Sequence, residues 1–191
     1  VRELEPVVGR AGGHFVGSHP MAGNERTGVG AAHAGLFEGA VSVVTPTERT
    51  SARALRQVRR LWQCLGCRVL ELSPEEHDRL VSRSSHLPHV AAAALASLVL
   101  APGRSPHQGT LCATGFRDTT RVASGSPEMW RDIALSNRRH LGRALGELVR
   151  ELEEVRRWLA AGDGEALLRF FQTAKERRDA WCAGNASPSP E

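Results

Sequence analysis

A strand–helix–strand pattern in the first part of the sequence constrains the fold of this chain most. Residues 40–45 and 68–72 are short apolar runs of strand length. Between them, apolar side chains recur at helical spacing over 54–65, after a threonine and a serine at 50–51 that can cap a helix. Two strands joined by a helix predict a parallel pair with a right-handed crossover, and therefore an α/β sheet.

A further strand is expected at 14–18, just before His19. Phe15 and Val16 suit a buried parallel strand, and Pro20 is expected to end it because proline cannot donate to a sheet ladder. Ligands of open α/β sheets bind outside the carboxyl ends of the strands, and an imidazole exchanges a proton near neutral pH. His19 is therefore a candidate catalytic residue, with a histidine that only caps a turn as the alternative.

From Ser73 onward the pattern is helical almost to the end of the chain. Ser73 is followed by a proline and two glutamates, which is a helix N-terminal signal. The alanine-rich segment 90–100 is apolar on nearly every face, which predicts a buried helix. A heptad seam then either packs within a helical bundle or pairs two subunits; it consists of Leu141, Leu145, Leu148, Leu152, Val155 and Leu159.

Composition and charge argue against nucleic-acid and membrane partners. The net charge is +4 with both signs intermixed, and no basic stripe is interleaved with aromatic residues. The longest apolar run, 90–101, is too short to span a bilayer. Cys64 and Cys67 have the spacing of half a zinc site or of a redox pair, but no second half exists, so we expect ordinary buried cysteines. A reduced, cytoplasmic protein without a leader peptide is expected.

Three later clusters complement His19. The stretch 85–89 (SHLPH) brings two imidazoles to a helix start, and 115–121 (GFRDTTR) brings two guanidinium groups together. Trp130 follows nine residues after the second arginine. Arginine grips carboxylates bidentately, and tryptophan offers a flat wall for a ring. The set suits a substrate with two carboxylates and a six-membered ring.

Taken in order, these stretches resemble the prephenate and arogenate dehydrogenases, which make the precursor of tyrosine. The resemblance covers nearly the whole chain, and its pieces are GSHPMAG at 17–23, LFEGA at 36–40, TP at 45–46, HD at 77–78, SHLPH at 85–89, GFRDTTRVA at 115–123 and WRDI at 130–133 with Asn137. It implies the C-terminal part of a Rossmann-type parallel sheet in 1–72, followed by an all-helical substrate-binding and dimerisation domain in 73–191.

The resemblance also implies an activity, which is the oxidative decarboxylation of prephenate to 4-hydroxyphenylpyruvate by a homodimer, with NAD as the cofactor and NADP as the alternative. In the family's pattern, His19 accepts a hydrogen bond or a proton from the ring hydroxyl. Arg121 binds a substrate carboxylate, with Arg117 in support. The remaining residues implied in the pocket or at its entrance are His89, Trp130, Glu25 and Asn24.

Several alternatives stay open at this stage. Arogenate is the alternative substrate: the neutral Asn24 favours prephenate, because the amine of arogenate would favour an acidic neighbour, but Glu25 beside it weakens that preference. His77 and His86 are expected to be helix-cap or core hydrogen-bonding groups. A metal site formed by these two histidines and His89 is a further possibility, although the family needs no metal.

The chain departs from the family in its nucleotide-binding motif. A dinucleotide fold should carry Gly-x-Gly-x-x-Gly after a strand, with an acidic residue about twenty positions later. The segment 28–33 (GVGAAH) lacks the third glycine and no strand precedes it. The cofactor-binding residues are therefore unknown, and we expect a fragment, the C-terminal two thirds of the enzyme. A non-catalytic dimerising fragment that binds no cofactor is the alternative function.

Overall fold

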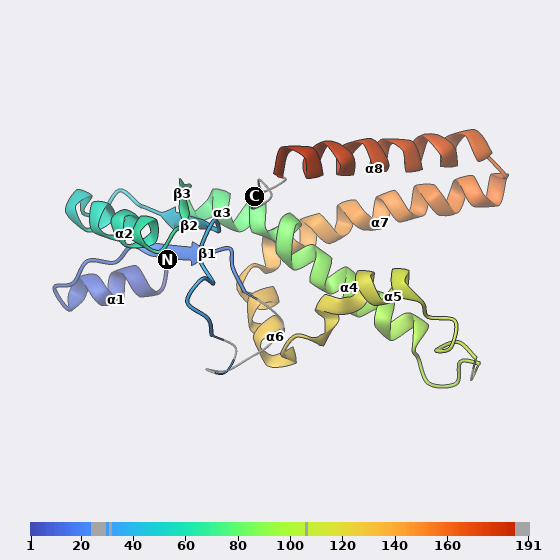
Figure 1. The fold of residues 1–191 in the computed structure, drawn as a ribbon, viewed down its shortest axis with the longest axis horizontal. Coiled ribbons are helices and arrows are strands. Elements are labelled where there is room, and N and C mark those ends of the chain that lie inside the picture. Colours follow the sequence, from blue (N-terminus) through green and yellow to red (C-terminus); the bar gives the residue numbers. More distant parts are fainter. Residues whose placement is uncertain (24–29, 31, 106, 186–191) are drawn as a thin grey trace. The chain divides into compact units, whose positions relative to one another are not determined.

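The structure, a computed structural model, describes residues 1–23, 30, 32–105 and 107–185. The chain divides into two units, Val1–Gly142 and Arg143–Glu191, and each is described here by itself (Figure 1). Helices make up most of both, and the first unit also contains a small mixed sheet. The first unit begins with a short helix, α1 (Leu4–Arg10).

The predicted strand–helix–strand unit is present. β2 (Val41–Thr45) and β3 (Arg68–Glu71) pair in parallel, and α2 (Ala52–Cys64) connects them. The hydroxyl of Ser51 accepts a hydrogen bond from a backbone N–H in the first turn of α2, as expected of a helix cap. β2 is the middle strand, and its last four residues are buried. The core of this unit therefore forms around β2.

The first strand differs from the prediction. β1 (Gly17–Pro20) pairs antiparallel with β2, so the expected parallel direction is wrong, and the expected bounds 14–18 are too early. The strand includes Pro20 because successive N–H groups of a strand point to opposite sides. The N–H of Met21 donates to the carbonyl of Val41 at 2.7 Å, so the nitrogen of Pro20 faces away from β2, where no donor is needed.

One long helical segment follows the sheet. α3 (Pro74–Val81) begins as predicted, with the hydroxyl of Ser73 accepting a backbone N–H of the first turn at 3.2 Å. The chain then passes through a π-helical segment, η2 (Ser82–His86), and continues directly as α4 (Leu87–Val99). α3 also packs against β2, which places its first turns beside the sheet.

The predicted burial of the alanine-rich helix is wrong for a single chain. Ala92 is the one buried residue of α4, and Leu98 is 61% exposed. A helix that is apolar on nearly every face needs cover on all sides. One copy of the chain covers only part of that surface.

Three short helices follow along the chain. They are α5 (Thr114–Thr120), the 3-10 turn η3 (Arg121–Ser124) and α6 (Pro127–Ser136). Both α5 and η3 pack along α4. α6 begins at Pro127, and the hydroxyl of Ser126 caps it.

The second unit is a helical hairpin. α7 (Arg138–Ala161) starts within the first unit, and α8 (Gly164–Asn185) follows after a two-residue turn. Asp163 caps α8 by accepting the backbone N–H of Ala166 at 2.9 Å. Leu152 and Leu159 of the heptad seam are 57% and 63% exposed, so the hairpin leaves part of the seam uncovered.

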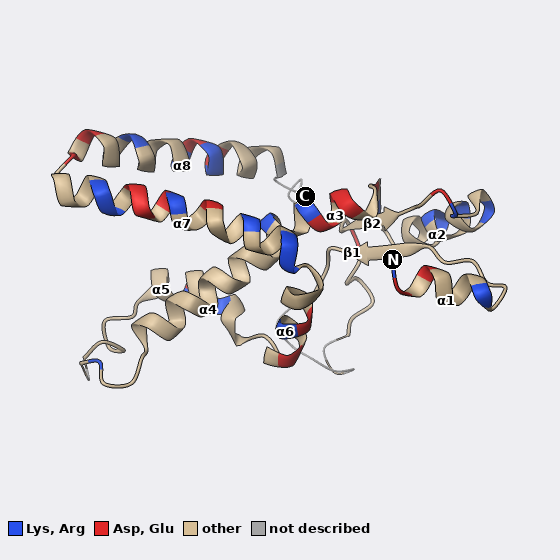
Figure 2. Cartoon of the chain, turned by 180° about the vertical axis from the view of Figure 1, so that it is seen from behind, with Lys and Arg blue, Asp and Glu red and all other residues tan. Residues whose placement is uncertain are grey.

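Charged residues of both signs are distributed along the hairpin, with no face of one sign (Figure 2). This agrees with the intermixed charge of the sequence. Within the described part of the chain, no helix combines the length and the apolar character that crossing a bilayer needs.

Candidate active site

His19 lies on the edge strand of the sheet and meets a second histidine there. Its imidazole is half-buried, opposite Val43 of β2. The Nδ1 atom of His19 and the Nε2 atom of His77 are 2.8 Å apart, which is hydrogen-bond distance. The two rings meet edge to face, with centroids 5.1 Å apart. Because His77 is in the first turn of α3, the helix start that follows β3 reaches back to β1.

His77 is itself hydrogen-bonded to a carboxylate. Its Nδ1 atom lies 2.9 Å from Oδ1 of Asp78, the next residue. The side chain of His77 is 15% exposed, whereas that of Asp78 is 52% exposed. Three side chains thus form a continuous row, with the exposed carboxylate of Asp78 at one end, the largely buried His77 in the middle and His19 at the other end.

The π-helical segment η2 places His86 near this row. An uninterrupted α-helix turns by about 100° per residue, so the nine positions from His77 would put His86 on the opposite face, about 180° away. A π-helical turn takes up one extra residue, which reduces the difference to about 80°. His86 therefore lies on the side of the helix that carries His77.

Asn137 connects His86 to the start of α3. It is buried, and its side-chain amide donates to the backbone carbonyl of Asp78 at 2.7 Å. The same amide nitrogen lies 3.3 Å from Nδ1 of His86. Asn137 ends α6, so the amide ties two helices to one another at the site.

Burial and mutual repulsion keep two of these imidazoles uncharged. Burial lowers the pKa of His19, and the neighbouring His77 lowers it further. Burial is also the main cause of the lowered pKa of His86, followed by repulsion from His19. Asp78 opposes this effect at His86 without reversing it. At neutral pH both rings are neutral and each can use one nitrogen as a hydrogen-bond acceptor.

An aromatic stack forms a second part of the site. The ring of His89, at the start of α4, stacks on the indole of Trp130 with centroids 3.5 Å apart and planes 25° apart. His86 meets the same indole edge to face at 6.3 Å. The indole also lies against the backbone of Gly125, where a Cβ atom would come within 2.6 Å of Nε1. Glycine is needed at this position for the stack to form.

The structure places the two candidate arginines on neighbouring short helices. Arg117 is exposed in the last turn of α5, and Arg121 is exposed at the start of η3, which packs along α4. Asn24 and Glu25 lie outside the described residues. The predicted roles of all these residues stay predictions.

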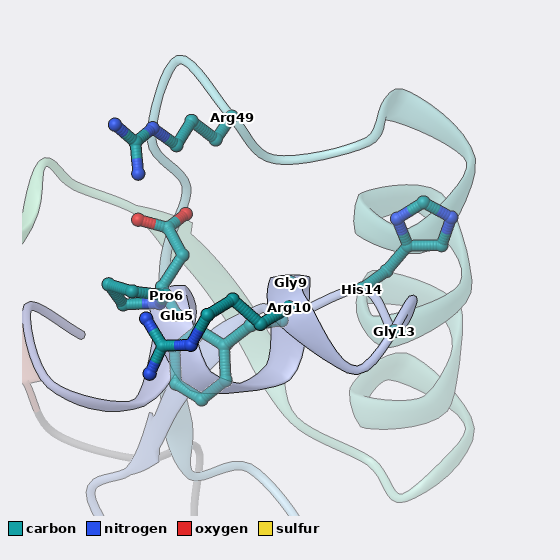
Figure 3. Close-up of a pocket in the computed structure, with 8 residues that line it drawn as sticks. Glu5, Pro6, Gly9, Arg10, Gly13, His14 and Arg49 are labelled. Carbon is teal, nitrogen blue, oxygen red and sulfur yellow. The ribbon is translucent and has the colours of Figure 1, made fainter.

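A cavity in the first unit lies elsewhere. It has a volume of about 380 Å³ and is lined by Glu5, Pro6, Gly9, Arg10, Gly13, His14, Phe15 and Arg49 (Figure 3). None of the predicted site residues lines it. The carboxylate of Glu5 already accepts a hydrogen bond from the hydroxyl of Thr47. The cavity therefore gives no reason to move the candidate site away from His19.

Sequence reasoning missed the roles of His77 and Asn137 in building the site. His77 is a hydrogen-bonding group, as expected, but its partner is His19 and the helix cap is Ser73. The helix start after β3 was visible in the sequence, whereas its return to β1 depends on packing. Among the described residues, no group of three or more histidine, cysteine, aspartate or glutamate side chains could hold a metal ion.

Comparison with known proteins identifies the family. The model of the prephenate dehydrogenase dimerization domain matches residues 73–173, and that of the prephenate dehydrogenase nucleotide-binding domain matches residues 1–71. The chain belongs to the prephenate dehydrogenase family. This confirms the resemblance seen in the sequence, and it places the chain in a family of oxidoreductases.

Individual relatives agree with this assignment. Prephenate dehydrogenase of Bacillus subtilis (strain 168) is 42% identical over 166 residues, which are 86% of this chain and 45% of the relative. A crystal structure of prephenate dehydrogenase from A. aeolicus, in complex with hydroxyphenyl propionate and NAD+, is 34% identical with a TM-score of 0.86 and covers 94% of this chain and 62% of that one.

An arogenate dehydrogenase is also similar. The structure of the enzyme from Synechocystis is 32% identical with a TM-score of 0.76, and it covers 87% of this chain and 61% of that one. This chain spans about half the length of the curated prephenate dehydrogenases that it matches.

Proposed function

We propose that this chain contributes the base and the substrate pocket of a prephenate dehydrogenase, which converts prephenate to 4-hydroxyphenylpyruvate and carbon dioxide. The observation that carries the proposal is the imidazole of His19. It is half-buried, is held by His77 at 2.8 Å and has a lowered pKa. A neutral, held imidazole is suited to accept a hydrogen bond from a substrate hydroxyl.

The reaction assigns a definite task to His19. A bound nicotinamide would supply the acceptor for the hydride of the hydroxyl-bearing ring carbon, and the electron pair of the bond to the departing carboxylate would make the ring aromatic. His19 accepts a hydrogen bond from the hydroxyl and so favours the development of carbon–oxygen double-bond character. The oxygen stays in the product as the phenol.

The second part of the site suits the rest of the substrate. The stacked rings of His89 and Trp130 provide a flat wall for a six-membered ring. Arg121, with Arg117 in support, is proposed to hold a carboxylate bidentately and so to fix the ring in the geometry of attack. Glu25 and Asn24 remain proposed residues of the pocket entrance.

NAD is the proposed cofactor, with NADP as the alternative. The described residues offer no cradle for its pyrophosphate, because neither strand-to-helix connection, 46–51 after β2 or 72–73 after β3, contains a glycine. The residues that bind the cofactor are therefore not assigned here. His19 and the pocket residues supply only the chemistry on the substrate side.

A homodimer is the proposed assembly. α4 has one buried residue in the single chain, and Leu98 on it is exposed. Leu152 and Leu159 leave the seam of α7 uncovered as well. The match of 73–173 to a dimerization domain supports a second copy of the chain as the partner that covers these apolar surfaces.

The test joins this chain to the preceding segment of the Bacillus subtilis relative and measures reduced nicotinamide with prephenate and with arogenate. We expect turnover that falls at least about 100-fold in His19→Ala, since general base catalysis contributes that much. Arg121→Ala should raise the KM. His107→Ala, in the loop after α4, is the matched control and should have no effect.

Each outcome decides between the candidates. Activity unchanged in both His19→Ala and Arg121→Ala would overturn the proposed site. A fused chain that dimerises but reduces no cofactor with either compound would favour the non-catalytic dimerising fragment. A faster reaction with arogenate than with prephenate would change the assigned substrate and leave the roles of His19 and Arg121 intact.

A further inference from the structure

We infer that His77 and Asp78 are positioning residues that fix the tautomer of His19, so that its Nε2 atom is the bare, substrate-facing nitrogen. The inference rests on the proposed function for the role of His19 as a base. Its evidence is the row of hydrogen bonds from His19 through His77 to the carboxylate. A neutral imidazole has one N–H and one acceptor nitrogen, and a hydrogen-bond partner decides which is which.

The direction of the hydrogen bonds in the row, from donor to acceptor, follows from the carboxylate at its Asp78 end. An ionised carboxylate has no proton to donate, so Asp78 can only accept from Nδ1–H of His77. With its ring proton on Nδ1, His77 presents a bare Nε2, which can only accept. The Nδ1 atom of His19, 2.8 Å away, must therefore carry the proton and donate it. Nε2 of His19 is left as the acceptor.

The surroundings of the row favour this arrangement. The side chain of His77 is largely buried, and Asp78 beside it is half exposed. The carboxylate of Asp78 therefore stays hydrated while its hydrogen bond fixes the orientation of the His77 ring. The pKa of His19 is lowered, which disfavours the doubly protonated ring. In that form both nitrogens would carry a proton, and no acceptor nitrogen would be left. The backbone carbonyl of Asp78 is held by Asn137, which fixes this turn of the helix.

A fixed tautomer has a direct consequence for catalysis. A free imidazole in water divides its proton between both nitrogens, so an unconstrained His19 would present a donor for part of the time. A donor at Nε2 repels the hydroxyl hydrogen that the reaction needs it to accept. The row removes that unproductive form before substrate arrives, and it does so without touching the substrate.

The experiment reads the tautomer directly by ¹⁵N nuclear magnetic resonance of the imidazole nitrogens in the 191-residue chain, without substrate or cofactor. In the wild type we expect a pyrrole-type signal for Nδ1 of His19 and a pyridine-type signal for Nε2. His77→Leu, which removes the acceptor, should shift both signals toward the averaged values of a tautomer mixture. His107→Leu is the matched control and should leave both signals unchanged.

Two further variants separate positioning from a general loss of structure. His77→Gln retains an oxygen that can accept from Nδ1–H, and it should restore the wild-type signals of His19. Asp78→Asn offers an N–H to His77, which favours the opposite direction of the row and should move the proton of His19 toward Nε2. Because Asp78 is half exposed, Asp78→Asn is expected to fold even if His77→Leu does not fold.

The outcomes distinguish this inference from the proposed function. A pyrrole-type Nε2 of His19 in the wild type, or signals that do not respond to His77→Leu and Asp78→Asn, would overturn the role of the pair and leave the assigned reaction untouched. An inactive fused enzyme whose His19 signals respond as expected would overturn the proposed function and leave the hydrogen-bonded row intact.

Discussion

The indole of Trp130 covers the imidazole of His89 in a near-parallel stack, with centroids 3.5 Å apart. Nδ1 of His89 lies 3.0 Å from the carbonyl of Ser85, so in the neutral ring this nitrogen donates and Nε2 remains an acceptor. The stack and this hydrogen bond together hold the ring of His89 in one orientation.

Removing the indole should weaken the binding of a ring-shaped ligand. We expect Trp130→Ala to lower the affinity for prephenate, the proposed substrate, roughly 5-fold, since an aromatic pair contributes about 1 kcal/mol beyond its buried area. Trp130→Phe keeps a ring and should lose less. Titration calorimetry measures both, with Trp181→Ala on α8 as the control. Equal affinity in Trp130→Ala and the wild type would show that this indole is not a wall of the pocket.

The close approach of Trp130 to Gly125 gives a second prediction. A Cβ at this position would come within 2.6 Å of the indole Nε1 and 3.0 Å of Cδ1. Gly125→Ala should therefore displace the indole and lower the free energy of unfolding by about 1–3 kcal/mol, the usual range for overpacking. Urea unfolding measures the loss, and the tryptophan emission of the folded chain reports the displaced ring.

Gly109→Ala is the matched control, because an added Cβ there meets nothing within 4 Å. It should change neither stability nor emission. If Gly125→Ala behaved in the same way, the packing of the indole on this glycine would be incorrect.

We expect the side-chain amide of Asn137 to make a measurable contribution to the free energy of unfolding. Asn137→Leu removes the amide that donates to the carbonyl of Asp78, and the loss of one such hydrogen bond costs about 0.5–1.5 kcal/mol. Gln63→Leu replaces an exposed amide on α2 and should stay within about 0.5 kcal/mol of the wild type. Urea unfolding compares the two, and equal losses would exclude a special role for Asn137.

The lowered pKa values of His19 and His86 make stability depend on pH in a definite direction. In the unfolded chain both rings take up a proton near their ordinary pKa of 6.5, whereas in the folded chain they do so only at lower pH. Between these values the unfolded state binds more protons, so stability falls as the pH drops below 6.5 and the two groups contribute nothing above it.

The double variant His19→Gln, His86→Gln should therefore lose less stability than the wild type between about pH 7 and pH 5. Histidine side chains ordinarily titrate in this range. Thermal unfolding at matched pH values measures the difference between the two chains. Parallel curves across this range would contradict the lowered pKa values.

The sequence predicted the local elements of the sheet domain and the parallel pairing of β2 with β3, but it did not predict how β1 pairs. The helix caps Ser51 and Ser73 are local signals, and each is found where it was expected. The direction of β1 was predicted wrongly, because alternation of apolar residues reports burial and carries no information about which way the neighbouring strand runs.

For the candidate site, too, the sequence predicted individual residues but not the contacts between residues far apart in the chain. His19, His89 and Trp130 were named from motifs, and the stack of the last two is present. The contact between His19 and His77 joins residues 58 positions apart, and no spacing in the sequence encodes it. The burial of α4 was overestimated because an apolar sequence does not say whether its cover comes from the same chain.

The π-helical segment η2 also bears on how relatives of this chain should be aligned. It lies between His77 and the pair His86 and His89, and it absorbs one residue without lengthening the helix by a full turn. A relative that lacks one residue within 82–85 would form a regular α-helix there, with eight positions and therefore about 80° between the counterparts of His77 and His86. In an evolutionary comparison, such a one-residue gap would keep both downstream histidines on the same side of the helix, so it would be no sign of a rebuilt active site.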